Sequence, residues 1–234
     1  MNCKNKNTHS WRFVILAGMV LCLAVCQLYM QQYESTMEKE QKVLAASGIL
    51  EKRIAITFDD GPNSDYTEML LEGLKERGVC ATFFLLGKEV EMYPDIVEKI
   101  QADGHLIGTH SYEHVNLCNL SDSAAIEQVD KANQAIYEVT GEYPEYIRPP
   151  FGCWKGNLDY ETKMIEVLWD IDPLDWKTSN SDVIAKRVID KAEENSIILL
   201  HDASESSVNA AFKIIDELQK EGYTFVTVDK ILFD

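Results

Sequence analysis

Short apolar runs alternate with amphipathic stretches from Arg53 onward, and this alternation constrains the fold more than any other feature of the chain. The runs are IAITF, ATFFLLG, LIGTH, YIR, VLWDI, IILLH and TFVTV. Between them, apolar residues recur at helical spacing, as at Val129, Ala132 and Ile136 or from Val208 onward. Strands that alternate with helices build a largely parallel sheet, so we expect a distorted, incomplete (β/α) barrel of about seven parallel strands.

Polar side chains with versatile chemistry stand at the carboxyl ends of these runs. They are Asp59, Asp60, His110, Arg148, Asp172, His201 and Asp202. In barrels and open parallel sheets, this rim is where ligands bind and catalysis takes place. The sequence therefore predicts one functional site whose residues come from several strands.

Two adjacent carboxylates, Asp59 and Asp60, end the first run. Successive strand side chains point to opposite faces, so a turn at Gly61 and Pro62 must redirect both carboxylates toward one site. The pair could then divide two roles. Taken alone, an Asp-Asp-Gly-Pro sequence is more often a solvated loop.

His110 and His114 stand four positions apart. We expect a helical turn that brings both imidazoles to one side. With a carboxylate they would form a two-histidine, one-carboxylate site that leaves positions on a divalent metal open for water and substrate. In isolation, the HSYEH segment would more often hold two surface or hydrogen-bonded histidines.

His201 follows the apolar residues 197–200, so it should lie at the end of a strand, where a histidine can act as a general acid near neutral pH. Asp175 would fix the tautomer of His201 and favour its protonated form by accepting a hydrogen bond. Trp176 could supply an apolar wall. The plainer alternatives are a buried structural histidine and a core tryptophan.

Arg148 precedes Pro149 and Pro150 in a segment that should be rigid and extended. Its guanidinium would therefore be held in place and could pair with a catalytic carboxylate. An ordinary ion pair is the alternative.

Five motifs carry a resemblance to a known family. They are TFDDGP at 57–62, HSYEH at 110–114, RPPFG at 148–152, DPLDW at 172–176 and LLHD at 199–202. In this order and spacing they resemble the motifs of the NodB-homology polysaccharide deacetylases, carbohydrate esterase family four. Any single motif is weak, but five in order are highly specific. The resemblance spans about residues 53–230.

The resemblance implies a metal-dependent deacetylase. Asp60, His110 and His114 would bind one divalent metal ion, usually zinc and sometimes cobalt or nickel. Asp59 would act as the base that takes a proton from water, and His201 would donate a proton to the departing amine.

The resemblance also implies supporting roles around this centre. Asp175 would tune the acid, and Arg148 would steady the base. The backbone N–H of Phe151 would bind the oxyanion. Trp176 and Leu199 would line the groove that receives the acetyl methyl group and the sugar ring.

Several residues depart from the family's pattern. Phe151 stands where tyrosine is common, Pro173 where serine is common, and Thr109 where asparagine commonly precedes the first histidine. Lys155 replaces a frequent asparagine, which concerns substrate detail. No departure removes a metal ligand or a proton carrier, so we expect an active enzyme.

The expected substrate is an extracellular polysaccharide, above all the N-acetylglucosamine of peptidoglycan. Chitin oligomers, an exopolysaccharide, N-acetylmuramic acid and O-acetylated xylan are alternatives, because the motifs fix the reaction rather than the sugar. A non-haem iron oxygenase is a rival class, since such enzymes also use two histidines and one carboxylate, although usually with a histidine and a carboxylate one residue apart. A non-catalytic carbohydrate-binding protein is another rival, but it would not need two proton carriers.

A long apolar run precedes the predicted domain, and its length fits one membrane-spanning helix. Basic residues lie before it and acidic residues after it, which predicts that the domain is exported. We expect a cytoplasmic segment over 1–12, a transmembrane anchor over 13–30, a stalk over 31–50 and an extracellular catalytic domain over 51–234. A cleaved signal peptide is the alternative, and it would make the protein secreted.

The formal net charge of -17 would repel a phosphate backbone, so we expect no nucleic-acid partner. Of the six cysteines, Cys80, Cys118 and Cys153 belong to the predicted domain. Their spacing matches neither a metal site nor a disulfide framework. We therefore expect mostly buried free thiols with at most one bridge.

Overall fold

The computed structural model describes residues 26–27, 29–32, 52–158 and 162–233. The chain divides into two units, Met1–Glu51 and Lys52–Asp234. In the first unit, residues 26, 27 and 29–32 are helical and exposed. No helix among the described residues combines the length and the apolar character that crossing a bilayer requires. Apart from those six positions, the predicted cytoplasmic segment, anchor and stalk lie outside the described residues.

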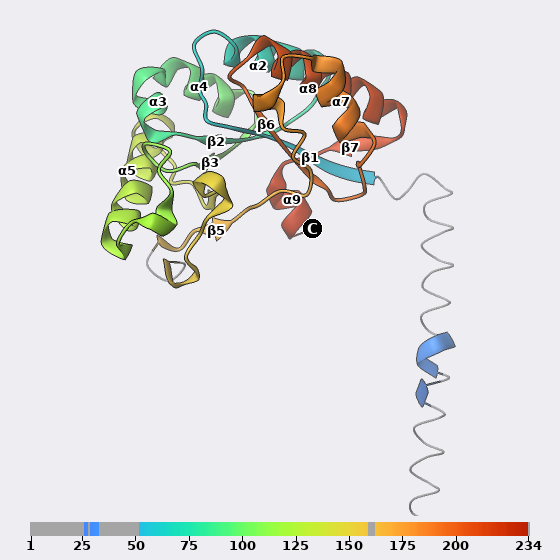
Figure 1. Cartoon of the computed structure of the whole chain (residues 1–234), viewed down its shortest axis with the longest axis horizontal. Helices are drawn as coiled ribbons and strands as arrows, with labels where there is room; N and C mark the ends of the chain where they lie inside the picture. The colour runs from blue at the N-terminus through green and yellow to red at the C-terminus, as the bar shows by residue number, and fades with distance from the viewer. Residues whose placement is uncertain (1–25, 28, 33–51, 159–161, 234) are drawn as a thin grey trace, which may run out of the picture. The chain divides into compact units, whose positions relative to one another are not determined.

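One sheet of seven strands forms the second unit (Figure 1). The strands are β1 (Lys52–Asp59), β2 (Thr82–Leu85), β3 (Leu106–Thr109), β4 (Tyr146–Ile147), β5 (Ile165–Glu166), β6 (Ile197–His201) and β7 (Tyr223–Phe225). Their order is β5-β4-β3-β2-β1-β6, with β7 paired to the first part of β1, and every pairing is parallel. Within the described part of the chain, no ladder joins β5 to β6 or β7, so the sheet is the incomplete barrel that the sequence predicts.

Helices connect the strands and cover the sheet (Figure 1). They are α2 (Thr67–Glu76), α3 (Gly87–Met92), α4 (Pro94–Ala102), α5 (Asp122–Thr140), α7 (Ser181–Ile189), α8 (Glu205–Lys220) and α9 (Val228–Leu232). Short 3-10 turns are η1 (Leu117–Asn119), η2 (Pro150–Gly152), η3 (Gly156–Leu158) and η4 (Asp175–Lys177). The boundaries of α5 follow from its sequence: Ser121 accepts a hydrogen bond from the Ala124 N–H at the start, and Gly141 ends the helix with φ 74°.

Strand β1 is fixed on both of its faces. Ile54, Ile56 and Phe58 belong to the large core cluster formed with α2, α4, α7 and α8. Ala55 lies on the opposite face, in a separate cluster with Phe84 of β2. Burial of apolar surface contributes roughly 25 cal/mol per Å². The carboxyl end of β1 is therefore a firm support for the residues that follow it.

The fifth strand differs from the prediction. The sequence predicts a strand over 167–171, whereas β5 comprises Ile165–Glu166 and Ile171 makes only an isolated bridge to β6. The carbonyl oxygens of Val167 and Leu168 each accept a hydrogen bond of 3.1 Å from the guanidinium of Arg148. The buried side chain of Arg148 therefore occupies two carbonyl oxygens that would otherwise be available for pairing with a neighbouring strand.

The expectation for the cysteines is also corrected. Cys118 and Cys153 form a disulfide with a Cα–Cα distance of 5.8 Å, and Cys80 is a free but exposed thiol. The prediction of mostly buried free thiols is therefore wrong for this unit, whereas the limit of at most one bridge agrees with the disulfide found among the described residues. The two bonded cysteines lie 35 positions apart and meet because they follow the neighbouring strands β3 and β4, which spacing alone does not reveal.

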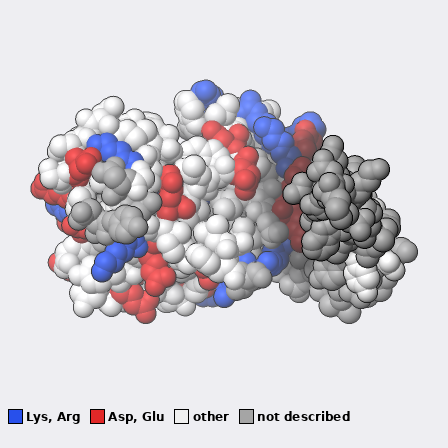
Figure 2. Space-filling view, turned by 90° about the horizontal axis from the view of Figure 1, so that it is seen from below, with Lys and Arg blue, Asp and Glu red and all other residues white. Residues whose placement is uncertain are grey.

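Charged side chains are dispersed on the face that Figure 2 shows. Lys and Arg lie there in several groups among acidic and uncharged surface (Figure 2). The absence of a nucleic-acid partner remains an expectation from the net charge.

Candidate metal centre and active site

The two adjacent carboxylates lie at the end of β1, and both approach the imidazole of His110. Asp59 is the last residue of β1, and Asp60 has a left-handed backbone with φ 73°. This reversal turns both side chains toward His110, whose Nε2 lies 3.9 Å from Oδ2 of Asp59 and 3.5 Å from Oδ1 of Asp60. The turn continues through Gly61 and a cis peptide bond to Pro62.

Asp60, His110 and His114 form a group whose ligand atoms all lie within 4.8 Å of one another. His114 Nε2 is 3.4 Å from Oδ1 of Asp60. That carboxylate oxygen is buried and has no hydrogen-bond partner among the described residues. Two imidazole nitrogens and one carboxylate oxygen are a donor set that suits Zn²⁺ and related divalent ions, so the residues fit the metal that the resemblance implies.

The protonation of His110 also suits a ligand. Its Nδ1–H donates a hydrogen bond of 2.6 Å to the carbonyl oxygen of Arg148, which leaves Nε2 with a free lone pair facing the carboxylates. Burial lowers the pKa of His110 below its usual value, although the charges of Asp59 and Asp60 oppose this effect. A neutral imidazole is the form that binds a metal.

The segment between the two histidines is not a helical turn, contrary to the prediction. It connects β3 to η1, and both Ser111 (φ 66°) and His114 (φ 57°) have left-handed backbones. The imidazoles nevertheless come together, with ring centroids 5.0 Å apart. The backbone reversal at these two residues replaces the helical geometry in bringing them to one side.

Arg148 is fully buried and fixes Asp59. Its Nη1 donates to Oδ1 of Asp59 at 2.8 Å and to Oγ1 of Thr57 at 2.6 Å. The buried carboxylate of Asp59 is only 3% exposed, so the guanidinium compensates its charge where water cannot. The predicted pairing of Arg148 with a carboxylate of the site is therefore present.

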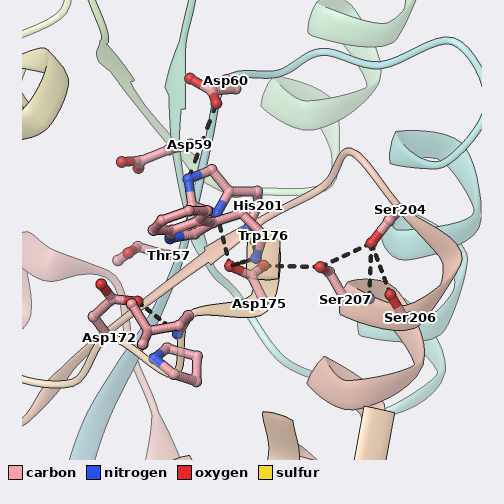
Figure 3. Close-up of polar contacts among 12 residues, drawn as sticks. Thr57, Asp59, Asp60, Asp172, Asp175, Trp176, His201, Ser204, Ser206 and Ser207 are labelled. Atoms are coloured by element: carbon pink, nitrogen blue, oxygen red, sulfur yellow. Dashed lines mark hydrogen bonds and ion pairs between the residues drawn. The ribbon is translucent and has the colours of Figure 1, made fainter. Parts of the chain in front are cut away.

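His201 lies at the end of β6 and is held by Asp175. Its Nδ1–H donates to Oδ1 of Asp175 at 2.8 Å, and its backbone N–H donates to Oδ2 at 2.9 Å (Figure 3). Burial alone lowers the pKa of His201, but the hydrogen bond and charge of Asp175, with the charges of Asp59 and Asp60, raise it to about 9. Nε2 of His201 lies 4.0 Å from Asp60, so the free ring nitrogen faces the metal-ligand group.

The three predicted substrate residues differ in their placement. Phe151 is 66% exposed and its ring packs against that of His114, with centroids 4.8 Å apart. Trp176 is 62% exposed and follows Asp175 in η4, which places it beside the His201 pair. Leu199 is buried in the middle of β6 and is only 5% exposed. The roles of these residues toward a substrate stay predictions.

Two hydroxyl groups that were not predicted support the site, and Asp202, which was predicted at the same rim, directly follows His201. Ser207 of α8 donates a hydrogen bond of 2.8 Å to Oδ2 of Asp175 (Figure 3). The Thr57 hydroxyl accepts a hydrogen bond from Arg148 and donates one of 2.6 Å to the carbonyl oxygen of Ile198. Asp202 is fully buried, and burial raises its pKa to about 7. Thr57 and Asp202 lie within the TFDDGP and LLHD motifs, so the sequence could indicate that they belong to the site. Ser207 lies outside all five motifs.

Comparison with known proteins agrees with this geometry. Residues 46–167 match the family model described as polysaccharide deacetylase. The peptidoglycan-N-acetylmuramic acid deacetylase PdaC of Bacillus subtilis is 38% identical over 198 residues, which cover 85% of this chain and 40% of that protein. The peptidoglycan-N-acetylglucosamine deacetylase PgdA of Listeria monocytogenes is 36% identical over 180 residues, which cover 77% of this chain and 39% of that protein.

The solved structure of PdaC shares the fold, with a TM-score of 0.75 and 39% identity over 77% of this chain and 90% of the solved chain. The present chain spans about two fifths of the length of the PdaC and PgdA proteins. The family match over residues 46–167 includes β1 and β3, the strands after which the metal-ligand group lies. The chain belongs to the polysaccharide deacetylase family.

Proposed function

We propose that this protein is a metal-dependent hydrolase that removes N-acetyl groups from peptidoglycan. One observation carries the proposal: the group of Asp60, His110 and His114 is flanked by the Asp59–Arg148 pair and by the His201–Asp175 pair. Amide hydrolysis needs a group that polarises the carbonyl, a base that deprotonates water and an acid that protonates the amine. The metal-ligand group, the Asp59–Arg148 pair and the His201–Asp175 pair would supply these three functions in that order. The names of the relatives support the substrate class.

A bound divalent ion would act as a Lewis acid that polarises the acetamide carbonyl and lowers the pKa of water. Asp59 would accept a proton from the attacking water. Because Arg148 holds one carboxylate oxygen, the other oxygen, Oδ2, is the one that faces His110 and the metal-ligand group. The backbone N–H of Phe151 would donate a hydrogen bond to the oxyanion, and this needs no particular side chain.

His201 would donate the proton that the departing amine needs. An amine is a very poor leaving group unless its nitrogen is protonated, so the reaction requires a general acid. The Asp175 hydrogen bond orients the ring and keeps its free nitrogen toward the reacting centre. The high pKa of His201 would keep this acid protonated at neutral pH.

We propose zinc as the ion, with cobalt and nickel as substitutes, because a site of two imidazole nitrogens and a carboxylate with open positions suits all three. We further propose N-acetylglucosamine as the preferred sugar of peptidoglycan. N-acetylmuramic acid, chitin oligomers, an exopolysaccharide and O-acetylated xylan remain alternative substrates.

We propose that the protein is anchored in the cell membrane by residues 13–30, with residues 51–234 outside the cell, or secreted if the segment is cleaved. The apolar run supports the anchor. The Cys118–Cys153 disulfide supports export, because disulfides persist in oxidising compartments. Cell fractionation with a protease added to intact cells tests this orientation, and full protection of the second unit would contradict it.

Acetate release tests the activity. The full chain in detergent would be stripped of metal with a chelator and assayed on purified peptidoglycan, chitin oligomers and acetylated xylan before and after zinc is added. Acetate that appears only with metal, and first from peptidoglycan, is the expected result. Release from chitin oligomers alone would change the proposed substrate, and zinc binding without acetate from any glycan would favour a non-catalytic carbohydrate-binding protein.

A further inference from the structure

The Cys118–Cys153 disulfide joins two loops that both carry residues of the candidate site. Cys118 lies in η1, four residues after His114, and Cys153 lies two residues after Phe151. One loop follows β3 and the other follows β4, and these strands are neighbours in the sheet. Neither sulfur has a part in the proposed reaction, so the bridge needs another explanation.

The two site residues nearest to the bridge in the sequence have unfavourable backbones. His114 has φ 57° and Phe151 has φ 61°, and both are L-residues in the left-handed region. Such conformations cost energy and persist only where the surroundings impose them. Phe151 is 66% exposed, so burial of its side chain contributes little to holding its loop, although its ring packs against that of His114. The constraint must come from neighbouring residues.

Polar and apolar contacts join the same two loops. Nζ of Lys155 donates to the carbonyl oxygen of Leu120 at 2.6 Å and to Oδ1 of Asp122 at 2.9 Å. Leu117 is fully buried in a cluster against which Leu120 and Trp154 pack. The disulfide, the Lys155 contacts and this cluster therefore act on one pair of loops, and the disulfide is the only covalent link there among the described residues.

We propose that the Cys118–Cys153 disulfide, assisted by Lys155, is a positioning link for the metal centre. It holds the loop of His114 against the loop of Phe151, so that the third metal ligand and the oxyanion-binding N–H keep their separation. This inference rests on the proposed function for the roles of these two residues. A bridge that only stabilised the fold would change the free energy of unfolding and leave the metal affinity of the folded protein unchanged.

Reversible reduction gives a direct test. Tris(carboxyethyl)phosphine breaks the S–S bond: each sulfur gains one electron and one proton, and the phosphine becomes its oxide with the oxygen of water. Removing the phosphine under argon leaves the dithiol protein. Oxidised glutathione then restores the bridge, because the two thiols lose two electrons and two protons as two molecules of reduced glutathione form.

The experiment compares four forms of the full chain in detergent: oxidised wild type, reduced wild type, the double variant Cys118→Ser/Cys153→Ser, and the control Cys80→Ser. Zinc affinity is measured by calorimetry on metal-free protein, and kcat and KM by acetate release. Reduction and the double variant should each weaken zinc binding roughly tenfold, as changes to supporting residues of metal sites do. They should also lower kcat more than they raise KM, while Cys80→Ser changes neither.

Two controls isolate the bridge. Reoxidation should restore zinc affinity in the wild type and not in the double variant. Lys155→Met should make the oxidised protein bind zinc slightly more weakly and should enlarge the effect of reduction, whereas Lys186→Met, which removes an exposed pair with Asp190, should not.

Equal zinc affinities in the oxidised and reduced proteins, with circular dichroism showing both folded, would overturn the proposal. Global unfolding of the reduced protein and of the double variant would also overturn it, because the bridge would then serve the fold and not the site. If the oxidised wild type binds zinc but releases no acetate, the proposed function fails. The comparison of affinities still decides the role of the bridge in that case.

Discussion

Asp59 and Asp60 are neighbours in the sequence, yet they meet different partners. Oδ1 of Asp59 is 2.8 Å from the buried guanidinium of Arg148, whereas Oδ1 of Asp60 lies 3.4–3.5 Å from both His110 and His114. Because the backbone of Asp60 is left-handed, the side chains of these two consecutive residues meet different partners. These different partners suit the proposed division, in which Asp59 would act as the base and Asp60 as a metal ligand.

Substitution of each carboxylate should separate the two roles. Asp60→Ala should lose metal and activity together, because it removes a ligand. Asp59→Asn should retain the metal and lose activity by roughly a hundredfold or more, since the amide cannot accept the proton of water. Metal content by elemental analysis and acetate release measure both effects. Equal metal loss in the two variants would contradict this division of roles.

The His201–Asp175 pair should be visible in the pH dependence. Asp175→Asn removes the negative charge that raises the pKa of His201, so the alkaline limb of kcat/KM, where the acid loses its proton, should move to lower pH. An NMR titration of His201 in the metal-free protein should show the same direction. Ser207→Ala removes only one hydrogen bond to Asp175 and should shift the limb less. An unchanged limb in Asp175→Asn would exclude His201 as the acid.

The same pair links stability to pH in the metal-free protein. The pKa of His201 is raised from 6.5 to about 9 in the folded state. A raised pKa means that the protonated form stabilises the fold. That contribution is therefore complete below about pH 6.5 and is lost as the pH rises through about 9.

The sequence motifs predicted which residues form the site better than they predicted the contacts between those residues. Four of the five motifs placed a carboxylate, an imidazole or a guanidinium at the end of a strand, whereas DPLDW follows a segment that makes only an isolated bridge. The hydroxyl of Ser207, which orients Asp175, lies in α8 and has no motif of its own. Such a contact depends on how a helix packs, and a linear pattern does not contain that information.

At the scale of elements, Arg148 acts as a connector between strands. It follows β4, and it donates to residues of β1 and to the carbonyl oxygens of Val167 and Leu168 beyond β5. Its side chain also lies over the ring of Phe84 in β2, 4.2 Å from the centroid. Three strands and a connecting segment therefore share one buried cation.

Loss of this cation should destabilise the whole sheet. Arg148→Met leaves the buried carboxylate of Asp59 without a counter-charge and two carbonyl oxygens without donors. The free energy of unfolding should fall by about 3 kcal/mol or more, measured by denaturant titration of the metal-free protein. Lys186→Met, which removes an exposed pair, is the control and should cost at most about 0.5 kcal/mol. A loss below about 1 kcal/mol in Arg148→Met would contradict the connector role.

Periodicity predicted most elements, and its errors have local causes. The run over 167–171 has the composition of a strand, but its carbonyls serve Arg148 instead. The HSYEH spacing fits a helical turn, but left-handed residues at Ser111 and His114 form a different turn. The Arg148 contacts replace the predicted strand in the first case, and the left-handed residues replace the predicted helical turn in the second.

At the scale of the molecule, metal binding should be coupled to folding. The ligands follow β1 and β3, which are not adjacent along the chain, so only the folded state brings them together. Free zinc at one hundred times its Kd should stabilise the protein by about 2.7 kcal/mol and raise the unfolding midpoint. Differential scanning fluorimetry with and without chelator measures this shift. Asp60→Ala is the control, and an equal shift in that variant would place zinc at another site.

The sequence by itself determined the fold class and the chemical inventory of this protein. Alternating runs require a parallel sheet, and polar residues at the ends of those runs are directed to one rim because all the strands point the same way. The tertiary structure decided the contacts that no motif names. Ser207 donates to Asp175, Arg148 donates to the carbonyl oxygens of Val167 and Leu168, and Cys118 bonds to Cys153 because segments that are distant in the chain pack together. A periodic pattern reports the environment of each residue along its own element, whereas these contacts depend on how separate elements pack together.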